Sequence, residues 1–168
     1  MLLPKNAVGW ALIAAIATPV ATVQSQGLRP QDVPRRVLPE LRAEFATGDV
    51  TTGHIAAGFH VNSGTYVRIA LLAGVGRAWM DDEEGESYRF ELQGRFHLDP
   101  FRSARFGVYG IGGVTVGYDP FADWQSRLVA GAGVELAAHG HATWAIETAF
   151  AGGFRVSLVT RRLTLGRR

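Results

Sequence analysis

The sequence predicts an all-β protein, an eight-stranded antiparallel up-and-down transmembrane β-barrel. Three observations predict it: segments in which apolar and polar residues alternate, turn signals between those segments, and an N-terminus typical of a secretory signal peptide. The chain has 168 residues, enough for one domain with a sizeable core. It has no cysteine, which excludes disulfides, cysteine-based zinc sites and thiol catalysis.

The N-terminal segment indicates the compartment. Residues 1–25 carry one positive charge at Lys5 and then a mostly apolar run that ends in small residues, so we predict a signal peptide cleaved after Ser25. An uncleaved anchor helix is the alternative, but the run of about 17 residues is short for a membrane span and contains Pro19. Residues 26–39 contain three prolines and no periodicity, and we expect a flexible periplasmic leader there. The barrel domain is then residues 40–168.

Alternating segments follow one another through the barrel domain. Turn signals such as Gly48–Asp49 and Asn62–Ser63–Gly64 separate them, and each connection is short enough for a hairpin. The fifth segment is rich in glycine and does not reveal its two faces. The eighth changes parity at Arg161–Arg162, as a bulge or a strand end would allow. The first seven segments cover residues 40–45, 54–61, 66–75, 87–99, 104–118, 127–138 and 144–150, and the eighth runs from Phe154 to the change of parity.

Alternation alone does not say which face lies inside. A soluble sheet buries its apolar face, whereas a barrel in a membrane turns that face toward lipid and encloses the polar one. The polar faces here carry both signs of charge in near balance with glycine and alanine between them, as a narrow enclosed lumen requires. We therefore predict a charge network in the lumen, formed by Glu40, Arg42, Glu44, Arg68, Arg89, Glu91, Arg95, Arg127, Glu135, Glu147 and Arg155. The predicted lipid-facing residues are Phe90, Leu92, Phe96, Leu98, Leu128, Val134, Leu136 and Ile146.

Two further patterns favour apolar residues outside. After Lys5 the chain has no lysine but sixteen arginines, and guanidinium suits multidentate pairing with carboxylates, although a codon bias toward arginine would give the same count. Aromatic residues gather near the connections in two groups, as expected where a barrel crosses both membrane interfaces. The acidic run at residues 81–86 falls on the side of the first, fifth and seventh connections. A periplasmic N-terminus would make that side extracellular, where we interpret the run as a solvated hairpin end.

The stretches FGVYGIGGVTVGYD, RLVAGAGVEL and WAIETAF give the chain a glycine-aromatic texture. With them, residues 40–165 resemble the small outer-membrane β-barrel proteins of Gram-negative bacteria, of the OmpA/OmpX type and the opacity-protein-like group. The resemblance implies an outer-membrane location, contact with outer-membrane lipids and lipopolysaccharide, and a structural or surface-interaction role. The chain departs from this family at its end, LTLGRR, where such barrels usually carry a terminal aromatic residue.

The sequence contains few candidate residues for catalysis or for binding a metal, cofactor or nucleic acid. The scattered arginines form no basic stretch, so we expect no nucleic acid as a partner, and we expect no cofactor. His139 and His141 could hold a metal, but a turn is the better interpretation because no carboxylate lies close in sequence. A lipid A-modifying enzyme is a less favoured alternative. The deacylases among such enzymes carry a His-x-Ser-Asn signature, which the order His60–Val61–Asn62–Ser63 does not match.

We therefore expect no catalytic or metal-binding residues and no enzyme. A lumen-facing His–Ser pair within hydrogen-bond reach would reopen the enzymatic alternative, and we expect His54, His60 and His97 in the lumen. The other alternative is a soluble periplasmic barrel that binds a small apolar ligand, which would require the two faces to be reversed.

Overall fold

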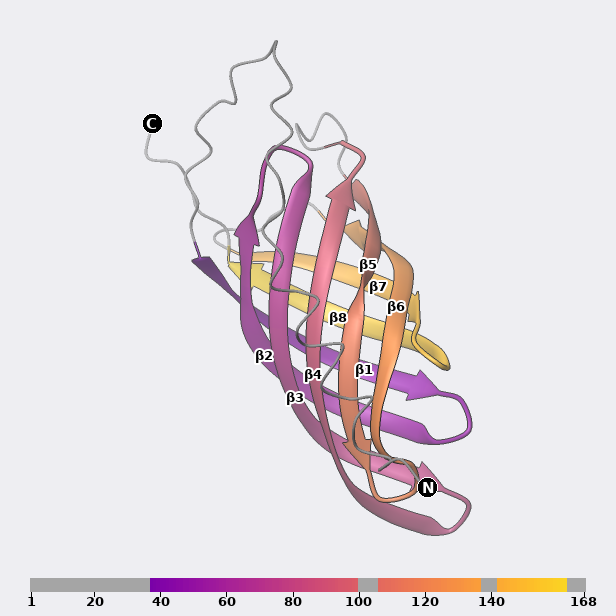
Figure 1. The fold of residues 1–168 in the computed structure, drawn as a ribbon. Coiled ribbons are helices and arrows are strands. Elements are labelled where there is room, and N and C mark those ends of the chain that lie inside the picture. The colour runs from indigo at the N-terminus through magenta and orange to yellow at the C-terminus, as the bar shows by residue number, and fades with distance from the viewer. Residues whose placement is uncertain (1–36, 100–105, 137–141, 163–168) are drawn as a thin grey trace, which may run out of the picture. The chain divides into compact units, whose positions relative to one another are not determined.

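The computed structural model describes residues 37–99, 106–136 and 142–162, which form a closed barrel of antiparallel strands (Figure 1). Each strand pairs with its neighbour in sequence, and β1 pairs with β8 to close the barrel, so the predicted fold class is confirmed. The strands are β1 (Val37–Thr47), β2 (Thr51–Asn62), β3 (Val67–Met80), β4 (Glu83–His97), β5 (Gly107–Asp119), β6 (Asp123–Glu135), β7 (Ala142–Phe150) and β8 (Phe154–Arg162).

Within the described residues, no helix is long and apolar enough to span a membrane.

Several strand ends differ from the sequence-based boundaries. β1 begins at Val37, inside the segment that we assigned to the leader, and includes Pro39. β8 pairs with β1 only from Glu40 onward, so the missing N–H of Pro39 removes no hydrogen bond to β8. β3 and β4 also extend further than the alternation predicts, and only Asp81 and Asp82 lie between them. The predicted signal peptide and its cleavage after Ser25, the leader up to residue 36, and His139 and His141 lie outside the described residues.

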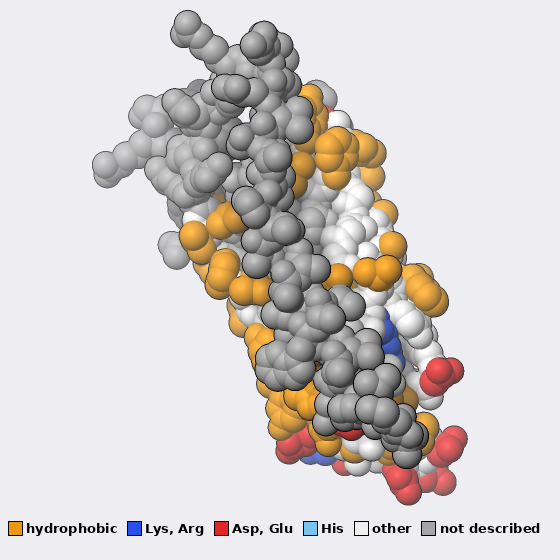
Figure 2. Space-filling model, in the orientation of Figure 1, with side chains coloured by type: hydrophobic (Ala, Val, Ile, Leu, Met, Phe, Trp, Pro, Cys, Tyr) orange, Lys and Arg blue, Asp and Glu red, His pale blue; other side chains and the backbone are white. Residues whose placement is uncertain are grey.

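Two faces of opposite character result from this barrel. On β4, Glu91, Gln93 and Arg95 are buried in the interior, whereas the intervening large apolar side chains are exposed. The same alternation runs around the barrel, and hydrophobic side chains cover much of its visible outer surface (Figure 2). A soluble barrel for an apolar ligand would need the reverse arrangement, so the structure contradicts that alternative.

The two ends of the barrel also differ. The connections after β1, β3, β5 and β7 lie at one end, and acidic side chains gather there (Figure 2). We call it the acidic end; it carries Asp49, Asp81, Asp82, Glu83, Glu84, Glu86, Asp119 and Asp123. Exposed aromatic rings mark both ends of the apolar band. Tyr118 stacks with Tyr88 and contacts Trp124 near the acidic end, while Tyr66 stacks on Phe96 near the opposite end.

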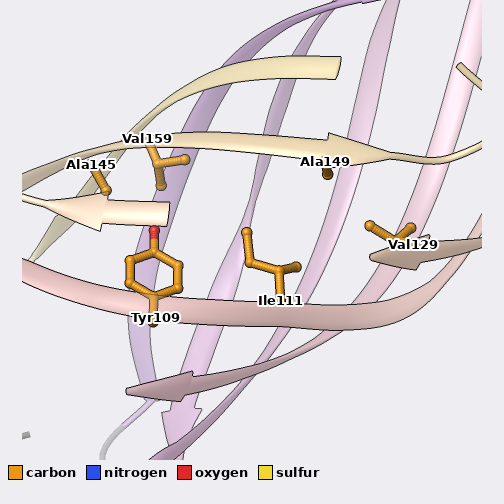
Figure 3. Packing of buried hydrophobic residues seen from close by; sticks show 6 residues of the cluster. All are labelled: Tyr109, Ile111, Val129, Ala145, Ala149 and Val159. Carbon is orange, nitrogen blue, oxygen red and sulfur yellow. The ribbon is translucent and has the colours of Figure 1, made fainter. Parts of the chain in front are cut away.

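The interior also holds a small apolar cluster on the side of β5 to β8. Figure 3 shows Tyr109 and Ile111 pointing from β5 across the interior toward Ala145 and Val159. Their inward direction resolves the fifth segment, whose faces the sequence left open. Opposite Tyr109 in the β5–β6 register lies Gly133, where a Cβ atom would come within 2.4 Å of the tyrosine ring. The glycine therefore provides the space that the ring fills.

Candidate functional site

The charged interior is the most distinctive feature of the barrel, and Arg42 on β1 lies near its centre. One guanidinium nitrogen of Arg42 donates to Glu91 at 3.0 Å, and the other donates to Gln93 and Glu147, each at 2.8 Å. Glu91 in turn accepts two hydrogen bonds from Arg155 on β8. Because the residues come from β1, β4, β7 and β8, these contacts tie opposite walls together across the lumen.

A second group of ion pairs lies toward the opposite end from the acidic one. Arg95 donates from both terminal nitrogens to Glu40, at 2.7 and 2.6 Å. Such paired contacts between a guanidinium and a carboxylate are stronger than hydrogen bonds between neutral groups. Arg161 on β8 contacts Glu40 at 3.1 Å and Glu135 at 2.9 Å, and also donates to Glu147. Its guanidinium also lies 5.2 Å from the centre of the Tyr109 ring.

The remaining residues of the predicted charge network lie nearer the ends of the lumen. Arg68 pairs with Glu135 at 2.9 Å, and Arg89 pairs with Glu44. Arg127 donates to Gln125, and no carboxylate among the described residues forms an ion pair with it. Each residue of the predicted network thus points into the interior: Glu40, Arg42, Glu44, Glu91, Arg95, Glu135, Glu147 and Arg155 are buried, and Arg68, Arg89 and Arg127 are half-buried.

The predicted lipid-facing residues lie on the outer surface. Leu128 is 79% exposed, Leu98 66% and Leu92 36%. Leu136, immediately after β6, is half-buried. The others are exposed, namely Phe90, Phe96, Val134 and Ile146.

Sequence reasoning missed some interior residues. Arg161 continues the inward parity of Arg155, Ser157 and Val159, so β8 has no bulge there. Leu163 and Leu165, which suggested the slip, lie outside the described residues. Tyr109 was missed because glycines on both faces of β5 hide its alternation. Gln93 was assigned to the polar face but not to the network, although it accepts hydrogen bonds from both Arg42 and Arg95.

A Glu–His–Ser row lies in the lumen below the acidic end. Glu44 and His54 are direct partners in the β1–β2 register, His54 and Gly76 in β2–β3, and Gly76 and Ser87 in β3–β4. Because Gly76 has no side chain, His54 reaches across β3, and its Nε2 lies 2.9 Å from Ser87 Oγ. The other ring nitrogen, Nδ1, lies 3.6 Å from Glu44 Oε1. The expected histidines in the lumen are indeed buried there, His60 and His97 as well as His54.

Little empty space remains inside. A cavity of about 50 Å³ lies under the connections of the acidic end, and we call it the mouth cavity. Its walls include Ser87, Arg89, Arg127 and Arg155. A buried water needs about 10–15 Å³ on this measure, so the cavity has room for about three to five water molecules. A second cavity of about 10 Å³ lies beside His54 and Arg42. Side chains therefore fill the lumen, as expected for a barrel of eight strands.

Solved structures share this fold. The N-terminal β-barrel domain of Pseudomonas aeruginosa OprF matches with a TM-score of 0.52 and 14% identity, over 75% of this chain and 95% of that one. Neisserial surface protein A (NspA) matches with a TM-score of 0.50 and 12% identity, over 76% of this chain and 96% of that one. A de novo designed transmembrane β-barrel matches with a TM-score of 0.50 and 13% identity, over 74% of this chain and 93% of that one.

No protein-family model and no curated protein sequence matches the chain. The structural matches show that the fold is that of the small eight-stranded transmembrane barrels.

Proposed function

We propose that this chain is an outer-membrane barrel with a side-chain-filled, salt-bridged lumen and a structural or surface-interaction role. The inverted distribution of polarity carries the proposal. Arg42, Arg95 and Arg155 are almost fully buried inside, while large apolar side chains cover the outside. Water would penalise so much exposed apolar surface, whereas membrane lipid would solvate it.

In this proposal, the predicted signal peptide sets the orientation of the barrel in the membrane. A cleaved signal peptide over residues 1–25 would deliver the chain to the periplasm, so the end of the barrel at which β1 begins would be periplasmic. The acidic end would then face outward, with the β3–β4 hairpin beyond the ring of aromatic residues. Its partners would be outer-membrane lipids and lipopolysaccharide. The family resemblance supports the same compartment.

Fractionation of the expressing cell tests the location. We expect the protein in the outer-membrane fraction, released by detergent, with a gel mobility that shifts on heating because the closed barrel resists unfolding by detergent. A protein released by osmotic shock without detergent would overturn the proposal.

Conductance across a planar bilayer tests the filled lumen. We expect no steady channel from the wild-type protein, with a large porin as the positive control in the same bilayer. A persistent open channel would show that the charge network does not close the lumen.

A further inference from the structure

The Glu44–His54–Ser87 row lies beside the mouth cavity at the acidic end of the barrel. A hydroxyl, an imidazole and a carboxylate in series are the groups that activate a serine nucleophile. Here the three side chains come from three strands, and Ser87 also lines the mouth cavity. The nucleophile candidate therefore borders a space that a small molecule can enter.

The charge of Glu44 decides the tautomer of His54. With its proton on Nε2, the imidazole would turn the lone pair of Nδ1 toward a carboxylate oxygen 3.6 Å away, which is electrostatically unfavourable. With its proton on Nδ1, the same contact becomes attractive, and Nε2 can accept a hydrogen bond from Ser87. The Ser87 hydroxyl has one proton and two acceptors at 2.9 Å, this nitrogen and the carbonyl oxygen of Tyr118, so it donates to His54 only when it turns away from that carbonyl. This tautomer allows His54 to act as a general base.

Neighbouring arginines complete the site. Arg89 pairs with Glu44 and donates to Thr52 at 3.4 Å, so it holds the carboxylate in place and is itself occupied. Arg127 lines the mouth cavity with Gln125 as its hydrogen-bond partner and without an ion pair among the described residues. Its guanidinium is therefore the donor available to an oxygen on which negative charge develops.

We propose that Ser87, His54 and Glu44 form a serine-esterase site at the acidic mouth of the barrel, for esters with a short acyl group such as acetate. Ser87 Oγ attacks the carbonyl carbon, and its proton passes to His54 Nε2. The ester C–O bond then breaks, and the leaving alkoxide takes that proton. Water hydrolyses the acyl-serine with His54 again as the base, which releases a carboxylic acid and restores the hydroxyl. Glu44 is a positioning residue because it acts through His54.

The size of the cavity sets the substrate class. Room for about three to five water molecules admits an acetyl group but not a long acyl chain. The charged side chains of Arg89, Arg127 and Arg155 in the walls also disfavour a hydrocarbon tail. Activity on short acyl esters and not on long ones is thus part of the proposal.

The test uses the full chain folded in detergent with 4-nitrophenyl acetate as the probe. Release of nitrophenolate is followed, and the acetylated residue is identified by peptide mass spectrometry. We expect the acetyl group on Ser87. We also expect the rates of Ser87→Ala and His54→Gln to fall by at least about 100-fold, the lower end of general-base contributions. The matched control is Ser126→Ala, which removes an exposed serine on β6 and should leave the rate unchanged.

Two further measurements separate catalysis from structure. Glu44→Gln should lower kcat with little change in KM and move the pH–rate profile, while the heat-modifiable gel mobility persists. The laurate ester should not be hydrolysed. Acetylation of the wild-type protein only at residues other than Ser87 would overturn the proposal, and so would equal rates in the wild type and Ser87→Ala. The first outcome needs no variant, so it remains decisive if Ser87→Ala fails to fold.

Discussion

At the scale of single residues, each buried charge in the lumen depends on its partners. Glu91 is 3% exposed and lies between two arginines, accepting hydrogen bonds from Arg42 and Arg155. Attraction in the interior has to offset the loss of hydration of all three groups, so removing one partner leaves the others uncompensated. Surface pairs are different, because water solvates their charges in either state.

Glu91→Leu should therefore lower the free energy of unfolding by about 3–5 kcal/mol, because two buried guanidiniums each lose a carboxylate partner. Urea unfolding in lipid vesicles measures the change. Glu84→Gln is the matched control, since it breaks the exposed pair with Arg77, whose oxygen–nitrogen distance is 3.3 Å, and should cost no more than about 1 kcal/mol. Equal effects of the two substitutions would contradict a buried network.

The contact between His54 and Ser87 could not be predicted from the sequence. His54 was expected inside the barrel from its parity, but Ser87 was not singled out. Their contact depends on the registers of β2, β3 and β4 and on the missing side chain of Gly76. Residues 33 positions apart cannot be paired from alternation alone.

At the scale of strands, glycines decide how interior side chains fit. A Cβ atom on Gly133 would lie 2.4 and 2.6 Å from ring atoms of Tyr109, well inside van der Waals contact. A Cβ atom on Gly112, on the outer face of β5, would meet nothing within 4 Å. The two glycines therefore play different roles, although the sequence shows them in similar glycine-rich segments.

Gly133→Val should destabilise the barrel by about 1–3 kcal/mol through overpacking against the tyrosine ring. Gly112→Ala should stay within about 1 kcal/mol of the wild type, since alanine restricts the unfolded chain more than glycine does. Unfolding in vesicles compares the two. A neutral Gly133→Val would mean that Tyr109 does not occupy the space above that glycine.

The seam between β1 and β8 closes the barrel, and Arg161 and Glu40 are direct partners across it. Their side chains also hydrogen-bond at 3.1 Å. A double-mutant cycle with Arg161→Met and Glu40→Gln should give a coupling energy of about 0.5–3 kcal/mol, as for residues in one network. Additive effects of the two substitutions would show that the pair does not contribute to closure.

The strands themselves could be read from the sequence, because alternation with period two reports directly on the two faces of a sheet. The strand ends could not be predicted. Pro39 and the acidic run look like strand breakers, yet β1 includes Pro39 and β4 includes the run from Glu83 onward. Arg161 was left out of the predicted network for a related reason: the leucines beyond it suggested a bulge or a strand end, and β8 keeps one parity up to that residue. Pairing with a neighbouring strand, not local preference, settles these positions.

At the scale of the whole molecule, the barrel is inverted: charged side chains fill its interior and apolar side chains cover its outside. The sequence predicted this because charges of both signs shared one face with small residues, which only an enclosed lumen requires. Which arginine meets which carboxylate could not be predicted, because the partners come from strands far apart in the chain. Arg42 contacts Glu147, for example, across 105 positions.

The unfolding free energy of Leu92→Arg in lipid vesicles tests the inverted barrel most directly. Leu92 is the outward neighbour of Glu91 on β4, between the aromatic residues Tyr88 and Phe96. If it faces lipid at mid-depth, a charge there should cost about 2–4 kcal/mol. A neutral Leu92→Arg, together with a Glu91→Leu that improves folding, would mean that the two faces are the reverse of those described.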